Sequence, residues 1–316
     1  QWDDVELMSI FQDLGGHDFE KLSESFSKAD AVHQPSVLFA YTLKGWRLPV
    51  IGDPHNHSVI LNKEDMEKLR VRCGVPEGDD WPKFPRESKV GYFCMETGKR
   101  LRSGAIKTPA ISSLVIPPSL GRTYQGNVST QQAFGLILTD ISRELPSIDK
   151  RVVTVSPDVA SSTNLGGRIN KVGIWSRIEG DPLPQEKDVR LLKWDESPKG
   201  QHVELGISES NLFMLLGQLG LSFERSGELL FPIGTLYDPF ICRAVEAFSY
   251  GVYSDARFIV VGTPSGITLS REGGAHQSAI TPSIGTELPG LVFYEPCFAQ
   301  ELEWILLASL NQVLHR

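Results

Sequence analysis

The chain has 316 residues and is acidic overall, with 39 Asp and Glu against 31 Lys and Arg and a formal net charge of −8, which argues against a general nucleic-acid-binding protein. Its hydrophobic fraction of 41% is ordinary for a globular protein, and its length allows one large core or two smaller ones. The 4 cysteines lack metal-ligand spacing, and neither a secretory signal nor a bilayer-spanning apolar run is recognisable, so we expect a cytoplasmic protein without a membrane segment.

The first third of the chain reads as helices joined by irregular segments. Apolar spacing predicts helices, and a continuous apolar stretch at 36–41 predicts one strand of the kind buried in a parallel sheet. Residues 103–128 are rich in Pro, Ser, Gly and Thr and show little periodicity, which predicts an interdomain linker. The helices are expected at residues 3–14, 18–31, 63–73 and 89–101.

Beyond this linker, strand and helix patterns alternate. Such alternation predicts right-handed crossovers and an α/β fold, with a mostly parallel sheet flanked by helices. The expected strands are 151–155, 203–205, 229–233, 257–262 and 291–294, and the expected helices are 130–145, 208–225, 239–254 and 298–315.

The most informative segment is the short apolar strand 203–205 and the helix that follows it. Gly206 relieves a sharp turn, Ser208 is a candidate N-cap, and Glu209 is a lone carboxylate in the first helical turn. The apolar run 212–223 buries one wide face of the helix. A carboxylate at this position commonly just complements the helix dipole, so the segment alone leaves its role open.

Further motifs occur at residues 14–18, 39–46, 56–58, 129–134, 156–158 and 273–277. In this order along the chain, they resemble the transketolase superfamily of thiamine-diphosphate enzymes. The similarity is greatest to the single-chain decarboxylating component of pyruvate dehydrogenase and its transketolase-like relatives. It implies that residues 1–102 are the C-terminal part of a diphosphate-binding domain, that 103–128 are a linker and that 129–316 form a pyrimidine-binding domain. The chain is therefore expected to be a fragment or one half of a split enzyme.

The resemblance implies that Glu209 hydrogen-bonds a ring nitrogen of the cofactor's aminopyrimidine and drives its tautomerisation. Phe240 is implied to stack on that ring, because an aromatic side chain follows the next strand in related enzymes. Tyr237 lies at the same strand end and is an equally ordinary candidate for core packing or for cofactor contact.

Three further residues are candidate contacts of the substrate or the cofactor. His276 lies in a glycine-containing loop and is implied to exchange protons with the bound intermediate. His57 is implied to be an active-site-loop histidine, although His55 competes for that alignment. Asp158 follows the strand 151–155, where ligands of open α/β sheets bind, but a turn or N-cap role is a serious alternative.

No metal site is predicted in this chain. His55, His57 and Asp53 have suitable ligand types, but their spacing is crowded and no further ligand is in view. The superfamily holds the diphosphate through Mg²⁺ on a Gly-Asp-Gly motif and a later Asn, and no such arrangement occurs here. The ligands of Mg²⁺ are therefore expected outside this segment.

The resemblance implies a thiamine-diphosphate-dependent enzyme that acts at the carbonyl of a 2-oxo acid or a ketose such as a sugar phosphate. A pyruvate dehydrogenase-like decarboxylation comes first, with a lipoyl-carrying acyltransferase as a partner. Because the insertion that full pyruvate dehydrogenases carry near residues 271–277 is missing, transketolase-type ketol transfer stays open. So does a non-catalytic subunit that supplies only a half-site. A homodimer or a split-chain assembly is expected, and the segment is expected to be inactive alone.

Overall fold

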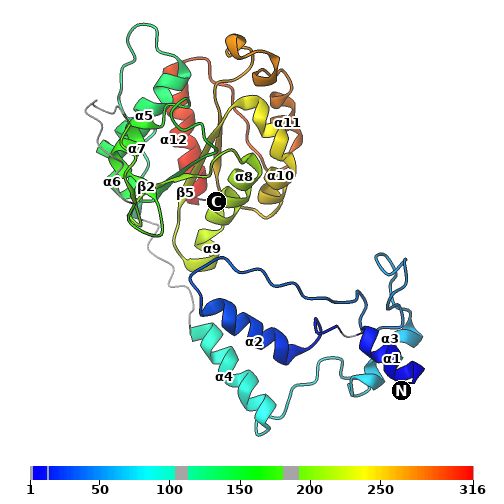
Figure 1. The fold of residues 1–316 in the computed structure, drawn as a ribbon. Coiled ribbons are helices and arrows are strands. Elements are labelled where there is room, and N and C mark those ends of the chain that lie inside the picture. The colour runs from blue at the N-terminus through cyan, green and yellow to red at the C-terminus, as the bar shows by residue number, and fades with distance from the viewer. Residues whose placement is uncertain (1–2, 13, 104–112, 181–191, 316) are drawn as a thin grey trace. The chain divides into compact units, whose positions relative to one another are not determined.

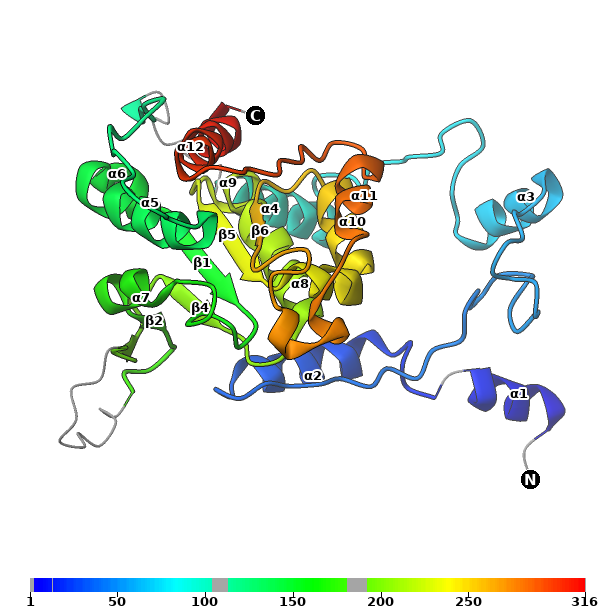
Figure 2. The ribbon, with the colours of Figure 1, turned by 90° about the horizontal axis from the view of Figure 1, so that it is seen from above.

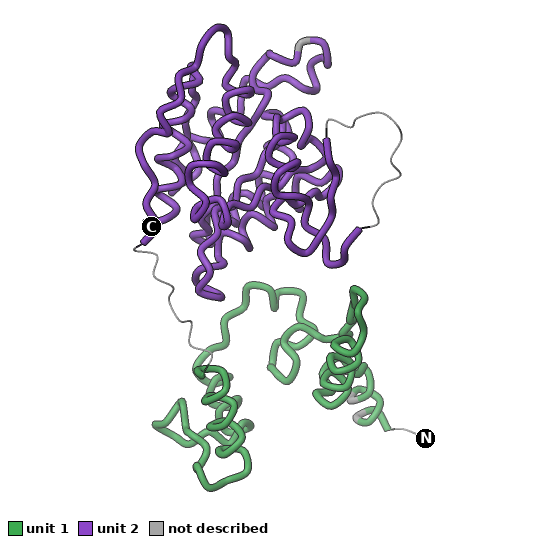
Figure 3. The backbone as a smooth tube through the Cα atoms, turned by 90° about the vertical axis from the view of Figure 1, so that its left-hand side faces the viewer, with its two compact units in different colours: residues 1–104 green, residues 105–316 purple. Residues whose placement is uncertain are grey.

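The computed structural model describes residues 3–12, 14–103, 113–180 and 192–315. The chain forms two compact units, residues 1–104 and 105–316, which Figure 3 shows in different colours. Of the expected linker 103–128, residues 104–112 lie outside the described residues.

The first unit contains the helices that the sequence predicts. They begin and end within a few residues of the expected positions, and α2 and α3 have side-chain N-caps from Asp18 and Asn62. The predicted strand 36–41 is wrong: the segment has no ladder partner among the described residues, and the side chain of Phe39 is 83% exposed. Its apolar run predicts burial, but the part of this unit that the structure describes contains no neighbouring strand to pair with it. The helices are α1 (Asp4–Gln12), α2 (Phe19–Asp30), α3 (Lys63–Arg72) and α4 (Lys89–Ser103).

The second unit is built on a six-stranded sheet in the order β3-β2-β4-β1-β5-β6, in which every pair of neighbouring strands is parallel. This confirms the α/β fold with a parallel sheet flanked by helices (Figure 1). The strands are β1 (Val152–Ser156), β2 (Ile174–Trp175), β3 (Glu196–Ser197), β4 (His202–Glu204), β5 (Phe231–Leu236) and β6 (Ile259–Gly262). The helices are α5 (Thr130–Glu144), α6 (Pro146–Asp149), α7 (Gly166–Val172), α8 (Glu209–Gly220), α9 (Ser222–Ser226), α10 (Val245–Tyr253), α11 (Thr281–Glu287) and α12 (Ala299–His315).

Helices cover both faces of the sheet (Figure 2). On one face, Val152 and Ile233 pack into a cluster with α5, α7 and α12; on the other, Val155 and Leu236 pack with α8 and α10. The alternation of side chains along each strand therefore supplies two cores, one on each face. Among the described helices, none has the combination of length and apolar character that crossing a bilayer requires.

Residues 113–128, the second part of the expected linker, belong to the second unit. Their apolar side chains pack against the core cluster around α5 and α12, and a buried carboxylate fixes their path. Glu303 of α12 has no exposed surface and accepts hydrogen bonds from Ser119 Oγ at 2.8 Å, Leu120 N at 2.9 Å and Tyr124 Oη at 3.1 Å. Three donors from one segment thus hold it against α12.

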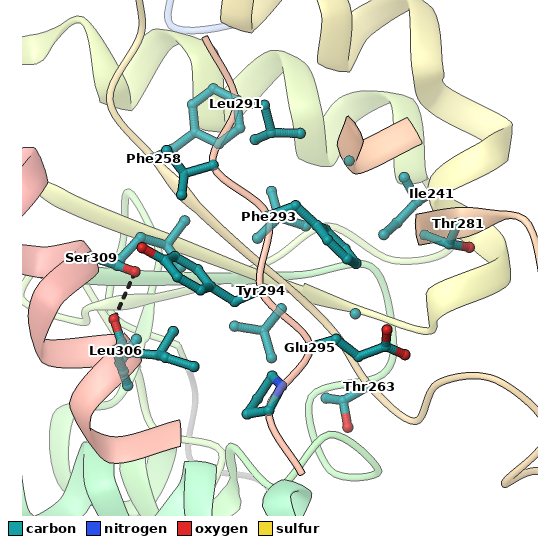
Figure 4. A pocket seen from close by; sticks show the side chains of 18 of the residues that line it. Ile241, Phe258, Thr263, Thr281, Leu291, Phe293, Tyr294, Glu295, Leu306 and Ser309 are labelled. Atoms are coloured by element: carbon teal, nitrogen blue, oxygen red, sulfur yellow. Dashed lines mark hydrogen bonds between the residues drawn. The ribbon is translucent and has the colours of Figure 1, made fainter. Parts of the chain in front are cut away.

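The predicted strand 291–294 is also wrong, because its backbone forms no ladder with β6. The apolar run is short and is bracketed by Pro289 and Gly290 before it and Pro296 after it. A cavity of about 320 Å³ is lined by this segment together with β6, α10 and α12. Figure 4 shows the aromatic side chains of this segment at the cavity rather than beside a paired strand.

Candidate functional site

The residues predicted for the pyrimidine site gather at the carboxyl ends of the parallel strands. Glu209 begins α8 a few residues after β4, Tyr237 follows β5 directly, and Asp158 comes two residues after β1. Loops that leave neighbouring parallel strands collect at one edge of a sheet, which is where open α/β folds bind ligands. The fold therefore brings together side chains from distant parts of the sequence.

Glu209 is the first residue of α8 and is only 9% exposed. Gly206 permits the turn before it, with a φ of +66°, as the sequence indicates. Ser208 occupies the N-cap position but donates and accepts no capping hydrogen bond through its side chain. The carboxylate of Glu209 pairs instead with Arg243, whose Nη1 lies 3.0 Å from Oε1.

The segment after β5 differs from the single helix 239–254 that the sequence predicts. Residues Asp238–Ala244 form the 3₁₀ helix η2, and α10 begins only at Val245. A 3₁₀ helix has three residues per turn, so side chains at i and i+3 lie above one another. Tyr237, Phe240 and Arg243 are spaced by three and therefore form a row.

The contacts between these side chains confirm the row. The rings of Tyr237 and Phe240 stack with their centroids 5.6 Å apart, and the guanidinium carbon of Arg243 lies 3.7 Å from the centroid of the Phe240 ring. That second contact is a cation–π interaction on the face of Phe240. Arg243 thus touches both residues that the sequence assigns to the pyrimidine, Glu209 and Phe240. The sequence does not predict this role of Arg243, because its ion pair with Glu209 joins two separate elements and its alignment with Tyr237, six residues earlier, needs a 3₁₀ helix.

His276 joins the same cluster from η4 (Gly274–His276). Its ring meets Phe240 edge-on with the centroids 5.2 Å apart, and Tyr237 at 6.0 Å. Its Nδ1 is buried and has no hydrogen-bond partner in the described part of the chain. A buried polar atom without a partner is costly, so Nδ1 is suited to form a hydrogen bond with a ligand.

Tyr237 also connects the cluster to the loop after β1. Its Oη donates a hydrogen bond to Ser162 Oγ at 2.8 Å, and the buried Thr163 hydroxyl lies 3.0 Å from that of Thr235 in β5. These contacts fix the loop after β1 against the end of β5. Tyr237 is thus held both by the hydrogen bond of its phenol and by the stacking of its ring on Phe240.

Asp158 contributes through its backbone, and its side chain is exposed. Its N–H donates to Glu204 Oε1 at 2.6 Å, and its φ of +67° is in the left-handed region. Glu204 Oε2 lies 3.4 Å from Nε2 of the fully buried His202, whose Nδ1 is 2.9 Å from Thr154 Oγ1. Sequence analysis also missed this polar chain, which joins the ends of β1 and β4.

Asp238 holds the loops after β5 and β6 together. The carboxylate is buried, and its Oδ2 accepts a hydrogen bond from Gly266 N at 3.0 Å, while its own N–H donates to Pro264 O at 3.2 Å. Because Asp238 is the first residue of η2, these bonds also set the start of the row that carries Phe240 and Arg243. The neighbouring cavity of Figure 4 reaches Asp238, but its lining does not include Glu209 or Phe240.

His57 lies in the first unit, where its Nδ1 is 3.0 Å from Lys44 Nζ. Asn56 supports this loop by donating to Lys44 O at 3.0 Å, and the nearby His55 lies 3.3 Å from Asp53 through Nδ1 and Oδ1. Among the described residues, no group of three or more His, Cys, Asp or Glu side chains is arranged to hold a metal ion.

Comparison with known proteins gives consistent results. A family model described as "Pyruvate dehydrogenase E1 component middle domain" matches residues 108–315. The chain is 25% identical to the pyruvate dehydrogenase E1 component of Cupriavidus necator and 24% identical to that of Pseudomonas aeruginosa, over 99% and 98% of its own length. It spans 37% and 38% of the length of these two relatives.

Solved structures with the same fold include two transketolases. That of Leishmania mexicana aligns with 93% of the chain and 43% of its own length, with a TM-score of 0.65 and 16% identity. That of Campylobacter jejuni aligns with 86% of the chain and 40% of its own length, with a TM-score of 0.57 and 16% identity. At this level of identity, the likeness shows a shared fold.

Proposed function

The chain belongs to the pyruvate dehydrogenase E1 component middle-domain family, and from this premise we propose that it supplies the pyrimidine half of a thiamine-diphosphate site. The function we propose for the assembled enzyme is decarboxylation of a 2-oxo acid, with pyruvate as the first candidate. The relatives named above support this choice, since they are pyruvate dehydrogenase E1 components.

One observation carries the proposal: a buried carboxylate and an aromatic ring occur side by side at the strand ends, bridged by one flat group. Glu209 and Phe240 come from different elements, α8 and η2, yet one planar guanidinium contacts both. A flat, nitrogen-containing group therefore fits between them. An aminopyrimidine has the same planarity and presents ring nitrogens to Glu209, so the residues present fit the ring of thiamine diphosphate.

In this proposal each side chain has a separate task. Glu209 holds a proton on its carboxylate and shares it with a pyrimidine nitrogen, since a carboxylate and a ring nitrogen are both acceptors and cannot bond without one. Phe240 orients the ring by stacking, and Tyr237 supports Phe240 from behind. The unpaired Nδ1 of His276 exchanges a proton with the substrate. When bound, thiamine diphosphate supplies the carbon nucleophile and takes up the electrons released by cleavage.

The diphosphate and Mg²⁺ are not assigned to residues of this chain. Hard cations need clustered oxygen ligands, and the described residues hold no such cluster. We propose that residues 1–102 are the end of a diphosphate-binding domain, that His57 acts from its loop, and that the metal ligands lie outside this segment. A homodimer or split-chain assembly completes the site, and a lipoyl-carrying acyltransferase accepts the product.

Asp158 belongs to the proposed site as a cofactor contact at its rim. Its backbone is fixed by Glu204 and its side chain is free to reach a ligand, because the carboxylate is exposed at the carboxyl end of β1. The contact is assigned to this side chain rather than to the backbone.

A second candidate is transketolase-type ketol transfer on a sugar phosphate. The observation that favours it is the short connection around His276, where Gly273 leads directly into the 3₁₀ turn η4 that begins at Gly274. A third candidate, from a different class, is a subunit that provides a half-site without taking part in the chemistry.

The test is a titration of the natural assembly with thiamine diphosphate and Mg²⁺, followed by turnover of pyruvate and of a ketose phosphate. The proposal predicts binding and release of CO₂ from pyruvate. Replacing Glu209 by Gln is expected to lower turnover by at least about a hundredfold. The matched control is Glu246→Gln, an exposed glutamate in the first turn of α10, which keeps wild-type turnover.

Each outcome selects one candidate. Turnover of the ketose phosphate in place of pyruvate would select ketol transfer. Binding without turnover of either substrate would select the half-site subunit. Wild-type turnover in Glu209→Gln would remove the assigned role of this carboxylate.

A further inference from the structure

We infer that Arg243 is an internal latch that occupies the pyrimidine position in the free chain and must leave before the cofactor ring can bind. The inference rests on the proposed function of Glu209 and Phe240, and it adds a competing ligand supplied by the protein itself. It concerns the regulation of binding at this site.

Arg243 contacts both residues of the proposed pyrimidine site. Nη1 of Arg243 donates to Oε1 of Glu209 at 3.0 Å, and the guanidinium carbon lies 3.7 Å from the centroid of the Phe240 ring. A stacking distance of this size leaves no room for another flat group on the same face of Phe240. The guanidinium and a pyrimidine ring that contacts both residues therefore exclude each other.

A guanidinium group and an aminopyrimidine make the same kinds of contact. Guanidinium is planar and presents N–H groups at its edge, and it is well suited both to pair with a carboxylate and to lie on an aromatic face. An aminopyrimidine is planar as well and makes the same two kinds of contact, one at its edge and one with its face. Arg243 thus imitates the ligand in shape while differing from it in charge.

The Arg243 side chain can leave Glu209 without a change in the fold. The side chain of Arg243 is 52% exposed, whereas that of Glu209 is 11% exposed, so the arginine can turn into solvent while the carboxylate stays in place. A half-exposed ion pair is weakly stabilising, so its loss does not endanger the fold. The position of Arg243, three residues after Phe240 in η2, explains why the closed arrangement forms.

The fraction of time for which Arg243 is away from Glu209 sets the affinity for the ligand. A site that is competent only while Arg243 is away binds its ligand with an affinity reduced by the open fraction. If the latch is closed for about four fifths of the time, the apparent affinity falls about fivefold. Removing the guanidinium is therefore expected to strengthen binding of the ring.

The test uses thiamine, which carries the aminopyrimidine but no diphosphate, so that the ring site is probed directly. Ligand-observed NMR titration of the full chain gives the dissociation constant for wild type, for Arg243→Ala and for Arg243→Gln. Arg225→Ala is the matched control, because Arg225 is an exposed arginine on α9 that pairs with Gln218 rather than with Glu209. Thermal unfolding confirms that each variant is folded.

The expected result is that Arg243→Ala binds thiamine about fivefold more tightly than wild type, with a smaller gain for Arg243→Gln and none for Arg225→Ala. Equal or weaker binding by both Arg243 variants, with measurable binding by wild type, would overturn the latch and leave the proposed function standing. Absence of binding in all four proteins would overturn the proposed function and the latch with it.

Discussion

The backbone N–H of Asp158 donates a hydrogen bond of 2.6 Å to Oε1 of Glu204, and this bond joins the ends of β1 and β4 at the rim of the site. Glu204 is in turn 3.4 Å from His202, which lies beside Thr154, so the loop after β1 is attached to the sheet by a chain of polar groups. The left-handed conformation of Asp158, with φ at +67°, is what directs its N–H toward Glu204. Mutation can therefore separate the structural role of the Asp158 backbone from the proposed role of its carboxylate in binding the cofactor.

Replacing Asp158 by Gly is expected to preserve stability, whereas Asp158→Ala is expected to lose about 1 kcal/mol relative to Gly, because only glycine adopts positive φ without strain. Chemical unfolding of the two variants measures the difference. Equal stabilities would show that residue 158 does not keep this conformation in solution. In the assembled enzyme, lower cofactor affinity of a stable Asp158→Gly variant would assign the contact to the carboxylate.

Glu303 gives the clearest prediction for stability. Its carboxylate is fully buried and accepts from Ser119, Leu120 and Tyr124. Glu303→Gln introduces an amide N–H₂ that faces these donors, and we expect a loss of about 2 kcal/mol in the free energy of unfolding. Asn311→Asp, a charge change at an exposed position of α12, is the control and is expected to change it by less than about 0.5 kcal/mol. A neutral Glu303→Gln would contradict the anchoring role.

Tyr124 predicts that the free energy of unfolding depends on pH in the alkaline range. Burial, and next the negative charge of Glu303, raise the pKa of Tyr124 above its ordinary value of 10.0. A raised pKa in the folded chain means that the stabilisation is complete below about pH 10 and is lost as the pH rises above it. The free energy of unfolding is therefore expected to fall between about pH 10 and 11 in wild type, and to fall less in Tyr124→Phe. Parallel pH profiles of the two proteins would contradict this assignment.

Gly234 tests the packing of α8, the helix that carries Glu209, against the sheet. A Cβ at this position of β5 would lie 2.5 Å from Cδ1 of Leu216 and 3.3 Å from Cδ1 of Leu212. Gly234→Ala is expected to cost about 1–3 kcal/mol through overpacking. Gly167→Ala on α7 is the control, since its Cβ would approach Thr139 only to 3.6 Å. Equal stability of the two variants would contradict the close approach of α8 to β5.

The sequence predicts the sheet well where strands are short, apolar and followed by a helix. The strand that ends at Leu205, the turn at Gly206 and the helix that begins with Glu209 are all expected from local patterns, and the structure has them within a residue or two. The same patterns fail at 36–41 and 291–294, because an apolar run predicts burial but not the partner strand that a ladder needs. Pairing is a property of the whole fold rather than of the segment.

The candidate site likewise contains some residues that the sequence predicts and others that it does not. Glu209, Tyr237 and Phe240 are predictable from their places after β4 and β5, whereas the role of Arg243 is not, because its ion pair with Glu209 joins two elements and its alignment with Tyr237, six residues earlier, needs a 3₁₀ helix. Only the switch to a 3₁₀ helix produces that row. The pairing of Asp158 with Glu204 is likewise a contact between two strand ends far apart in sequence.

The most direct test of the account is a crystal structure of the chain, within its natural assembly, with thiamine diphosphate bound. The account predicts that a pyrimidine nitrogen lies within about 2.6–3.2 Å of the Glu209 carboxylate and that the ring stacks on Phe240, with Arg243 displaced. A bound cofactor whose ring lies elsewhere, while Arg243 still pairs with Glu209, would contradict it.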